Sequence, residues 1–319
     1  MKTCKIWIFD VGRGFSAIIQ TPMGKWILID LGASDSFSPV TDFILPRLKA
    51  QKATRKDGRY EAAQLIISHP HDDHMTSLEE FDKHIYPVLL TVPNSVNHPK
   101  QPPGCKVNWA LIRNPSEDLT KYLREKMIPG REPPLRGTDQ DKSKGFVFKI
   151  YYIKPSTCEN DKDLSLTNYP NNISIMARLN YKGKVVLFCG DMMKDGMTKI
   201  ISSDDTFSQA LAKNGVDYLL APHHGLRSSF STDLFSTMKE GKTRALNIIS
   251  ERPTKKDSNE IVDSRYGLPD YCLGKNNLKR TNGKKVRQLR TSASGHTRII
   301  IFENGRSLVT TGVKALSAF

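Results

Sequence analysis

Four side chains of the kinds that bind metal ions fall within six residues of this chain, directly after a run of apolar residues. They are His69, His71, Asp73 and His74. The apolar run at 65–67 contains β-branched residues and is typical of a short strand buried on both faces. A loop that follows such a strand can turn several imidazoles toward one point. Nitrogen and carboxylate ligands without a thiolate favour zinc, with manganese or iron as alternatives.

The spacing of these side chains indicates two positions for cations. His69 and His71 are alternate residues of an extended segment, so their side chains point the same way and can share one cation. Asp73 and His74 follow and turn toward a second position a short distance away. The alternative is a chance collection of histidines in a solvated loop, and four ligands at this spacing argue against it.

Further along the chain, apolar runs separated by glycine-rich and polar turns predict the remaining elements. The expected strands are 5–9, 15–21, 26–29, 146–153, 173–181, 184–189, 216–221 and 244–250, followed by a hairpin over 297–311. The expected helices are 40–48, 78–84, 207–214 and 232–239. The first three strands read as an antiparallel meander at the edge of a larger sheet. The pattern as a whole indicates an α/β fold.

The motif His-x-His-x-Asp-His at 69–74 resembles the signature of the metallo-β-lactamase superfamily. Two longer segments, 9–34 and 171–191, resemble the metallo-β-lactamase domain of the ComEC-type competence proteins. A third segment, Pro-His-His-Gly at 222–225, matches the start of the family's Pro-His-His-Gly-Ser motif, with Leu226 in place of the serine. The resemblance implies a four-layer αβ/βα sandwich with two mixed sheets face to face and metal ions at one sheet edge.

The same resemblance implies two divalent metal ions, zinc or manganese, held by six ligands. These are His69, His71, Asp73, His74, Asp191 and His224. His69 and His71 then hold one cation, and Asp73, His74 and His224 hold the other. Asp191 lies between them, because the two oxygens of a carboxylate can serve two cations. By itself, an aspartate at this position is also compatible with an ordinary hairpin-end turn.

The adjacent pair His223-His224 leaves two assignments open. One imidazole binds a cation, and the other contacts the scissile phosphate or acts as a general acid. We expect His224 to be the ligand and His223, together with Asp73, to be catalytic. Three more side chains in this loop can bind a substrate phosphate: Arg227, Ser228 and Ser229.

Two residues are expected to support the ligands from behind. In the ComEC-type pattern, Asp30 orients a ligand histidine, although an aspartate at a strand end can equally cap the following turn. Many superfamily members have a further histidine ligand before the aspartate at 191, but none lies between His98 and His223 here. In the ComEC-type pattern, Asn172 and Ser174 lie where other members have this histidine. One cation is therefore expected to have fewer protein ligands and to bind a water or substrate oxygen in addition.

A single domain over 1–319 is expected from the length of the chain. A loop-rich, proline-broken insertion at about 93–145 interrupts it and is expected to lie over the site. The net charge is +15, and the stretch 275–290 contains seven basic residues and no acidic one. A cationic surface attracts phosphate backbones, so a nucleic-acid partner is expected. A solvated loop on a basic protein is an equally good explanation of the charge.

Composition also bounds the location of the protein. No apolar stretch approaches the roughly 20 residues of a membrane span, and the first residues are too soon followed by Asp10 to be a signal peptide. Five scattered cysteines without a Cys-x-x-Cys pair favour reduced thiols. We therefore expect a cytoplasmic protein that does not contact a membrane.

Together these features predict a metal-dependent hydrolase that cleaves phosphodiester bonds, with a hydroxide bridging the two cations as the attacking group. Zinc lowers the pKa of water from about 15.7 toward 7, so such a hydroxide can exist at neutral pH. A nuclease acting on DNA, or on RNA, is the leading hypothesis. The alternatives are hydrolysis of a small phosphodiester, such as a nucleotide second messenger or a phosphocholine ester, and a non-catalytic subunit that binds nucleic acid.

Overall fold

The computed structural model describes most of the chain, including both predicted sheets. The described residues are 2–51, 54–69, 71–93, 145–240, 245–251, 261–272, 275–279, 285–286 and 288–316. Almost all of the predicted insertion at 93–145 and part of the basic stretch at 275–290 lie outside these ranges. Within the described ranges, every helix is too short or too polar to cross a membrane.

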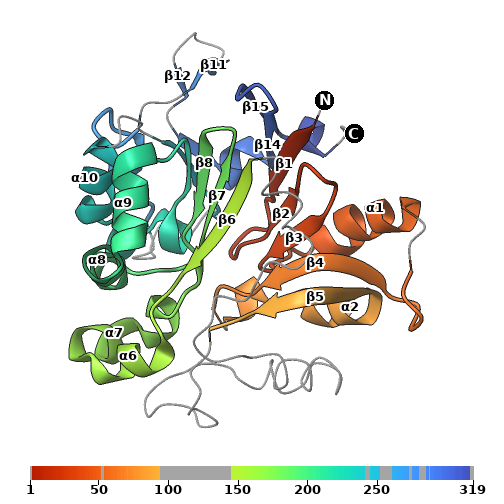
Figure 1. Ribbon diagram of the computed structural model, residues 1–319, viewed down its shortest axis with the longest axis horizontal. Coiled ribbons are helices and arrows are strands. Elements are labelled where there is room, and N and C mark those ends of the chain that lie inside the picture. Colours follow the sequence, from red (N-terminus) through yellow and green to blue (C-terminus); the bar gives the residue numbers. More distant parts are fainter. Residues whose placement is uncertain are drawn as a thin grey trace.

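Seven strands form the first sheet, in the order β15-β14-β1-β2-β3-β4-β5 (Figure 1). Their bounds are β1 (Thr3–Ile8), β2 (Ala17–Gln20), β3 (Trp26–Ile29), β4 (Tyr60–Ile66), β5 (Ile85–Thr91), β14 (Thr297–Phe302) and β15 (Ser307–Thr311). Neighbours from β15 to β3 are antiparallel, whereas β3, β4 and β5 are parallel. The predicted meander is confirmed, but its position at a sheet edge is wrong, because β14 and β15 return from the C-terminal part of the chain and extend the sheet beyond β1.

Six strands form the second sheet, in the order β13-β10-β9-β8-β7-β6. Their bounds are β6 (Phe146–Tyr151), β7 (Met176–Tyr181), β8 (Lys184–Phe188), β9 (Tyr218–Leu220), β10 (Leu246–Ile249) and β13 (Gln288–Arg290). The strands from β8 to β13 are parallel, and β7 and β6 are antiparallel to their neighbours. A separate two-stranded ribbon of β11 (Lys275–Lys279) and β12 (Lys285–Val286) precedes β13.

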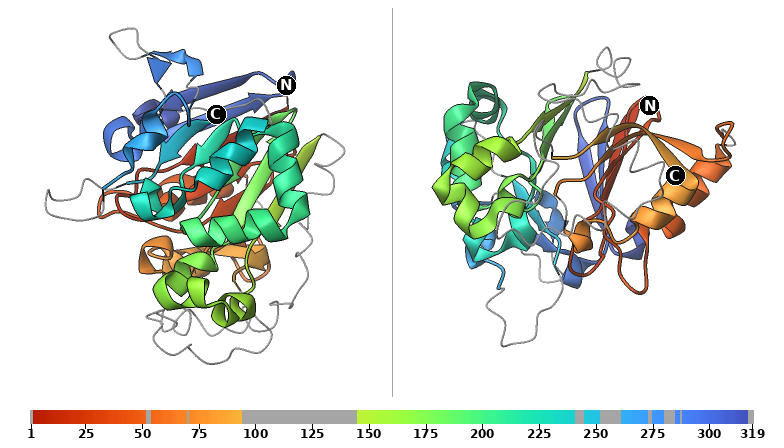
Figure 2. Two further views of the ribbon diagram at one scale, coloured as in Figure 1. Left: turned by 90° about the vertical axis from the view of Figure 1, so that its left-hand side faces the viewer. Right: turned by 90° about the horizontal axis from the view of Figure 1, so that it is seen from below.

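Helices cover the outer faces of both sheets (Figure 2). On the first sheet these are the π-helical turn η1 (Pro39–Ile44), α1 (Leu45–Ala50) and α2 (Leu78–His84). On the second they are α6 (Pro155–Asn160), α7 (Lys162–Asn172), α8 (Lys194–Ser203), α9 (Asp205–Asn214) and α10 (Thr232–Glu240). A short helix, α11 (Thr291–Ser294), links β13 to β14. The sequence prediction missed α6, α7, α8 and β5. It also began the strand of β7 at 173, three residues before Met176.

The layer between the sheets is an apolar core. Ile6, Ile19 and Ile299 of the first sheet and Leu179 and Phe188 of the second are almost completely buried there. Alternate residues of the same strands face the helices and form two further clusters. The chain is therefore a mixed α/β sandwich with two sheets inside and helices outside, which confirms the fold predicted from the sequence.

The two sheets are joined at one rim by hydrogen bonds as well as by the core. The backbone N–H of Ile175 donates to the carbonyl of Ser68 at 2.8 Å, and Ser250 Oγ donates to the carbonyl of Gly14 at 2.8 Å. Each bond connects a segment of one sheet to a segment of the other. Because β4, β8, β9 and β10 all end at this rim, the loops that follow them meet there.

Two glycines hold the loop at 68–74 closely against this rim. A Cβ at Gly14 would collide with the carbonyl of Asp73, and the φ of Gly14 is +108°. A Cβ at Gly32 would lie 2.6 Å from the same carbonyl oxygen. Such an approach of backbone to backbone requires residues without a Cβ.

We expect Gly14→Ala to lower the free energy of unfolding by several kcal/mol more than Gly24→Ala. Both glycines have a positive φ, so each substitution costs about 1–2 kcal/mol of backbone strain. Only Gly14 also faces a main-chain atom, since nothing lies within 4 Å of a Cβ at Gly24. Urea unfolding of both variants measures the difference, and equal destabilisation would contradict the packing described above.

Candidate metal centre

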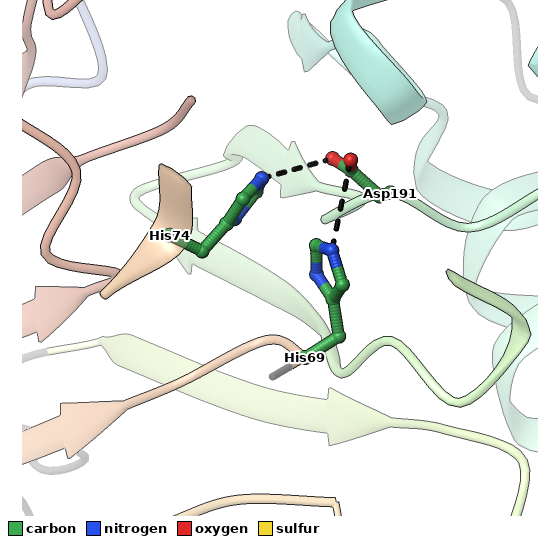
Figure 3. Close-up of side chains that lie close together, drawn as sticks. All are labelled: His69, His74 and Asp191. Atoms are coloured by element: carbon green, nitrogen blue, oxygen red, sulfur yellow. Dashed lines mark ion pairs between the residues drawn. The ribbon is translucent and has the colours of Figure 1, made fainter. Parts of the chain in front are cut away.

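Three segments that are far apart in the sequence converge at this rim. The loop 68–74 follows β4, Asp191 follows β8, and the pair His223-His224 follows β9. Figure 3 shows His69 and His74 approaching Asp191 from the opposite sheet. The atoms that face one another are imidazole nitrogens and carboxylate oxygens, which are the donor types that the sequence predicted for this site.

Asp30 lies behind the loop and binds it through three hydrogen bonds. Its Oδ1 accepts from the backbone N–H of Ser68 at 2.6 Å, and its Oδ2 accepts from Ser68 Oγ at 2.7 Å. Oδ2 also lies 2.7 Å from His74 Nδ1, which must carry a proton because an ionised carboxylate only accepts. Asp30 is fully buried and has a φ of +57°, a strained conformation for a residue other than glycine. Its carboxylate therefore orients a candidate ligand histidine and does not cap the following turn.

His74 is fully buried, and its second nitrogen faces a carboxylate without bonding to it. Nε2 lies 3.3 Å from Asp191 Oδ1, yet it makes no hydrogen bond within the described residues. Burial opposes protonation, but Asp191 and Asp30 outweigh it and raise the pKa of His74 well above its ordinary value. In the absence of a metal, this imidazole therefore holds a proton between two carboxylates.

Asp191 occupies the middle of the cluster. Its two oxygens lie between 3.3 and 3.8 Å from a ring nitrogen of each of four histidines: His69, His74, His223 and His224. Its backbone N–H donates to Ser174 Oγ at 3.1 Å, which anchors the residue after the turn at Gly190. Burial opposes ionisation, but the facing imidazoles, His224 foremost, hold the pKa of Asp191 well below its ordinary value.

His223 and His224 adopt left-handed backbone conformations, with φ of 45° and 55°. His224 Nδ1 donates to the carbonyl of Ser250 at 3.1 Å, and this bond leaves Nε2 pointing into the cluster. Nε2 lies 3.4 Å from Asp191 Oδ2 and 3.7 Å from Asp73 Oδ2. Strain at two successive residues is tolerated when function depends on where their side chains point.

Among the residues that the structure describes, two groups of three have ligand atoms close enough together to hold a metal ion. One consists of His69, His74 and Asp191, and the other of Asp73, His74 and His224. The single free lone pair of His74 can serve only one cation. If it serves the second group, His69 is left with Asp191 and with His71, whose Nδ1 lies 2.9 Å from His69 Nε2. The geometry is therefore compatible with the predicted allocation, although neither group of three contains His71.

The chemistry of these residues fits a divalent cation. Without one, the Nε2 of a buried histidine faces a carboxylate with no hydrogen bond, and buried polar groups of this kind are normally satisfied. Imidazole and carboxylate donors match zinc and its neighbours, and a carboxylate behind a histidine is the usual support of a metal ligand. The predicted ligands thus lie together, and the number and identity of the ions remain predictions.

The support predicted for Asn172 is not seen in the structure. Its side chain ends α7, where Nδ2 donates to the carbonyl of Leu164, and its Oδ1 faces Gly196 of α8. Ser174, two residues later, is the one that bonds to Asp191. Of the two residues that the sequence placed in this neighbourhood, Ser174 bonds to Asp191, whereas Asn172 belongs to the end of α7.

The three predicted phosphate-binding residues fall into two classes. Ser229 is fully buried, and its Oγ lies 2.8 Å from the carbonyl oxygen of Pro222 and 2.9 Å from that of Leu226, so that its single O–H is shared within the loop. This placement does not support the phosphate contact predicted for Ser229. Arg227 and Ser228 are exposed, and their contact with a phosphate remains a prediction.

Several residues that build the centre were not identified from the sequence. Ser68 joins the carboxylate of Asp30 to the histidine loop, Ser250 orients His224, and Gly14 holds the backbone of Asp73. Arg13 lies beside Asp73, with Nε 3.9 Å from Oδ2. For Gly14 and Arg13 the available signal was the Gly-Arg-Gly turn after the first strand, because loops at strand ends carry such contacts.

Comparison with known proteins supports one superfamily. The family model described as the metallo-beta-lactamase superfamily matches residues 9–158, nearly half of the chain. The matched span contains Asp30 and the loop 68–74 and ends before Asp191. This superfamily is metal-dependent, and the match supports a hydrolase. No curated protein matches the chain.

Three solved structures illustrate how distant the structural relatives are. A zinc-dependent hydrolase of the metallo-beta-lactamase superfamily from Thermotoga maritima, described as putative, is 13% identical, with 89% of this chain and 97% of that chain covered and a TM-score of 0.36. A diphosphatase from the PhnP family is 12% identical, with 96% and 97% covered and a TM-score of 0.39. The short form of human tRNase Z is 12% identical, with 78% and 93% covered and a TM-score of 0.31. Structures this distant do not indicate a substrate for the chain.

We expect Asp30→Asn to weaken zinc binding by about 10- to 100-fold, the usual cost of losing the group behind a metal ligand. Titration of the metal-free protein with zinc, against a competing chelator, measures the change. Asp217→Asn is the matched control, because Asp217 is bonded to Lys184 and Val185 at the opposite end of β8. Unchanged zinc affinity in Asp30→Asn would show that Asp30 supports the loop and not a ligand.

We also expect zinc affinity to rise with pH throughout the range from about 6 to 8. The pKa of His74 is raised, so at neutral pH a cation must displace its proton. A histidine with an ordinary pKa near 6.5 would stop contributing above about pH 7. The same competition titration, repeated at each pH, measures the slope. A plateau reached at about pH 7 would contradict the proton held between Asp30 and Asp191.

Proposed function

We propose that the chain is a metal-dependent hydrolase of the metallo-β-lactamase superfamily that cleaves phosphodiester bonds, and that it acts as a nuclease on DNA or RNA. The observation that supports this most strongly is the convergence of His69, His74, Asp191, Asp73 and His224 at one rim. Within the superfamily, the segments 9–34 and 171–191 favour the ComEC-type group.

The clustered histidines and aspartates would hold the metal ions. The group of His69, His74 and Asp191 and the group of Asp73, His74 and His224 would hold divalent cations, zinc or manganese. A bound cation supplies Lewis acidity toward a phosphoryl oxygen and lowers the pKa of water. The protein's own contribution is to fix the donors: Asp30 and Ser250 hold the rings of His74 and His224 so that each presents Nε2 to the cluster.

His223 is suited to move a proton. Its side chain is partly accessible, with Nε2 3.8 Å from Asp191 Oδ2. Burial and the neighbouring imidazoles lower its pKa, although Asp191 acts in the opposite direction, so the ring is neutral at physiological pH. A neutral imidazole at the edge of the centre can exchange a proton with an attacking or leaving oxygen. The backbone N–H of His223 donates to the carbonyl of Gly190, which keeps the ring beside Asp191.

The charge of the chain favours nucleic acid over a small substrate. A net charge of +15 concentrates polyanions near the surface and accelerates their encounter. Binding of this kind weakens steeply as salt rises, because counterions released from the nucleic acid must be recovered. A small phosphodiester releases few counterions and would show little salt dependence.

We expect the metal-loaded full chain to degrade DNA or RNA, and His224→Ala to reduce the rate by at least about 100-fold. A metal ion contributes several kcal/mol to phosphoryl transfer, and each 1.4 kcal/mol corresponds to a factor of ten. A panel of single- and double-stranded DNA, RNA, cyclic nucleotides and a phosphocholine ester measures the specificity. His84→Ala is the matched control, because His84 ends α2 and pairs with Glu80.

Each outcome of this panel decides between the functions considered. Salt-sensitive cleavage of nucleic acid that is lost in His224→Ala and kept in His84→Ala supports the proposal. Cleavage of small esters alone replaces the nuclease with a small-molecule phosphodiesterase. Binding of nucleic acid without cleavage, with zinc or with manganese, leaves a non-catalytic subunit.

A further inference from the structure

We infer that Arg13 binds the non-bridging oxygens of the substrate's phosphate and thereby selects for anionic phosphodiesters. The inference rests on the proposed function, since it names the substrate chemistry of the same centre. The residue is not a metal ligand and did not emerge from the sequence motifs. Its place in the structure, its exposure and its charge support the assignment.

The backbone around Arg13 is fixed beside the centre. Val11 is buried among the residues between the first sheet and its helices. Gly14 is held on two sides, because its carbonyl accepts from Ser250 Oγ at 2.8 Å and its Cα packs against the carbonyl of Asp73. Ser250 also binds His224 through its own carbonyl. One short loop thus joins Arg13 to both sides of the metal centre.

The side chain of Arg13 is open to solvent at this fixed point. It is 58% exposed, whereas the neighbouring Val11 and Gly14 are buried. The guanidinium Nε lies 3.9 Å from Asp73 Oδ2, which in turn lies 3.7 Å from His224 Nε2. An exposed ion pair at 3.9 Å is worth little. The pair with Asp73 is therefore weak enough to be exchanged for a stronger contact with an anionic ligand.

The positive charge of Arg13 complements the negative charge of a phosphate. The carboxylate of Asp73 is partly exposed beside the centre and repels an approaching phosphate. The guanidinium of Arg13, beside Asp73, offsets this repulsion. Its planar donors also match two phosphate oxygens at once, which an ammonium group cannot do. A neutral substrate gains nothing from either effect.

The test compares Arg13→Gln with wild type on two substrates that carry the same leaving group. One is bis(p-nitrophenyl) phosphate, an anionic diester, and the other is a neutral p-nitrophenyl phosphotriester. We expect the KM for the diester to rise by about 10- to 100-fold, as for the loss of hydrogen bonds to a charged group. The constants for the triester should stay within a factor of about three, and Arg13→Lys should recover part of the diester KM.

A second readout does not depend on activity. The affinity of the metal-free and zinc-loaded proteins for inorganic phosphate, measured by calorimetry, should fall by about tenfold in Arg13→Gln. Zinc affinity should not change. Arg306→Gln removes another exposed positive charge and is the control. Arg306 follows Gly305, which packs on the carbonyl of Lys182 in the β7–β8 turn, at the end of β8 away from Asp191.

The outcomes separate this inference from the proposed function. Equal loss on the diester and the triester, or a changed zinc affinity, would show that Arg13 acts on Asp73, and the inference would be overturned. Unchanged phosphate affinity would overturn it as well. If the wild-type protein hydrolyses no phosphodiester, the proposed function fails, while the phosphate titration still decides whether Arg13 binds the anion.

Discussion

The buried carboxylate of Asp30 is the interaction on which the rest of the site depends. A charge without access to solvent must be satisfied by hydrogen bonds, and Asp30 accepts them from the backbone and side chain of Ser68 and from His74. These bonds set the direction in which the chain leaves β4. They also fix which nitrogen of His74 carries a proton and which one faces the opposite sheet. The cost is a strained backbone at Asp30, which the surrounding bonds offset.

From that arrangement the need for a cation follows. Asp30 directs the Nε2 of His74 toward Asp191, and the carbonyl of Ser250 directs the Nε2 of His224 toward the same carboxylate. Donor atoms from both sheets are therefore held at separations near 3.5 Å with few hydrogen bonds among them. A proton on His74 satisfies part of this cluster, and a divalent cation satisfies more of it. The tight joining of the two sheets at Ser68 and Gly14 keeps the donors from relaxing apart.

The sequence predicted the elements that carry strong local patterns and missed those that depend on packing. The loop 68–74 and the helix over 78–84 were predicted because ligand spacing and helical period are local signals. Asn172 was predicted as a supporting residue because α7, with weak amphipathicity and an internal Pro170, resembles a loop in the sequence. The polar character of Ser229 indicated a binding role, whereas the fold buries it and uses its hydroxyl inside the loop. Which glycines face the carbonyl of Asp73 depends on how the loop at 68–74 packs against the loops after β1 and β3. No local sequence pattern contains that information.

The rim between the sheets is expected to hold metal ions on residues from three separate segments. Anomalous X-ray scattering from crystals of the zinc-loaded protein, recorded on both sides of the zinc absorption edge, tests this most directly. We expect an anomalous peak within about 2.0–2.3 Å of a carboxylate oxygen of Asp191 and of at least one of the facing imidazole nitrogens. Zinc found only on surface histidines, with the cluster around Asp191 devoid of anomalous signal, would contradict this expectation.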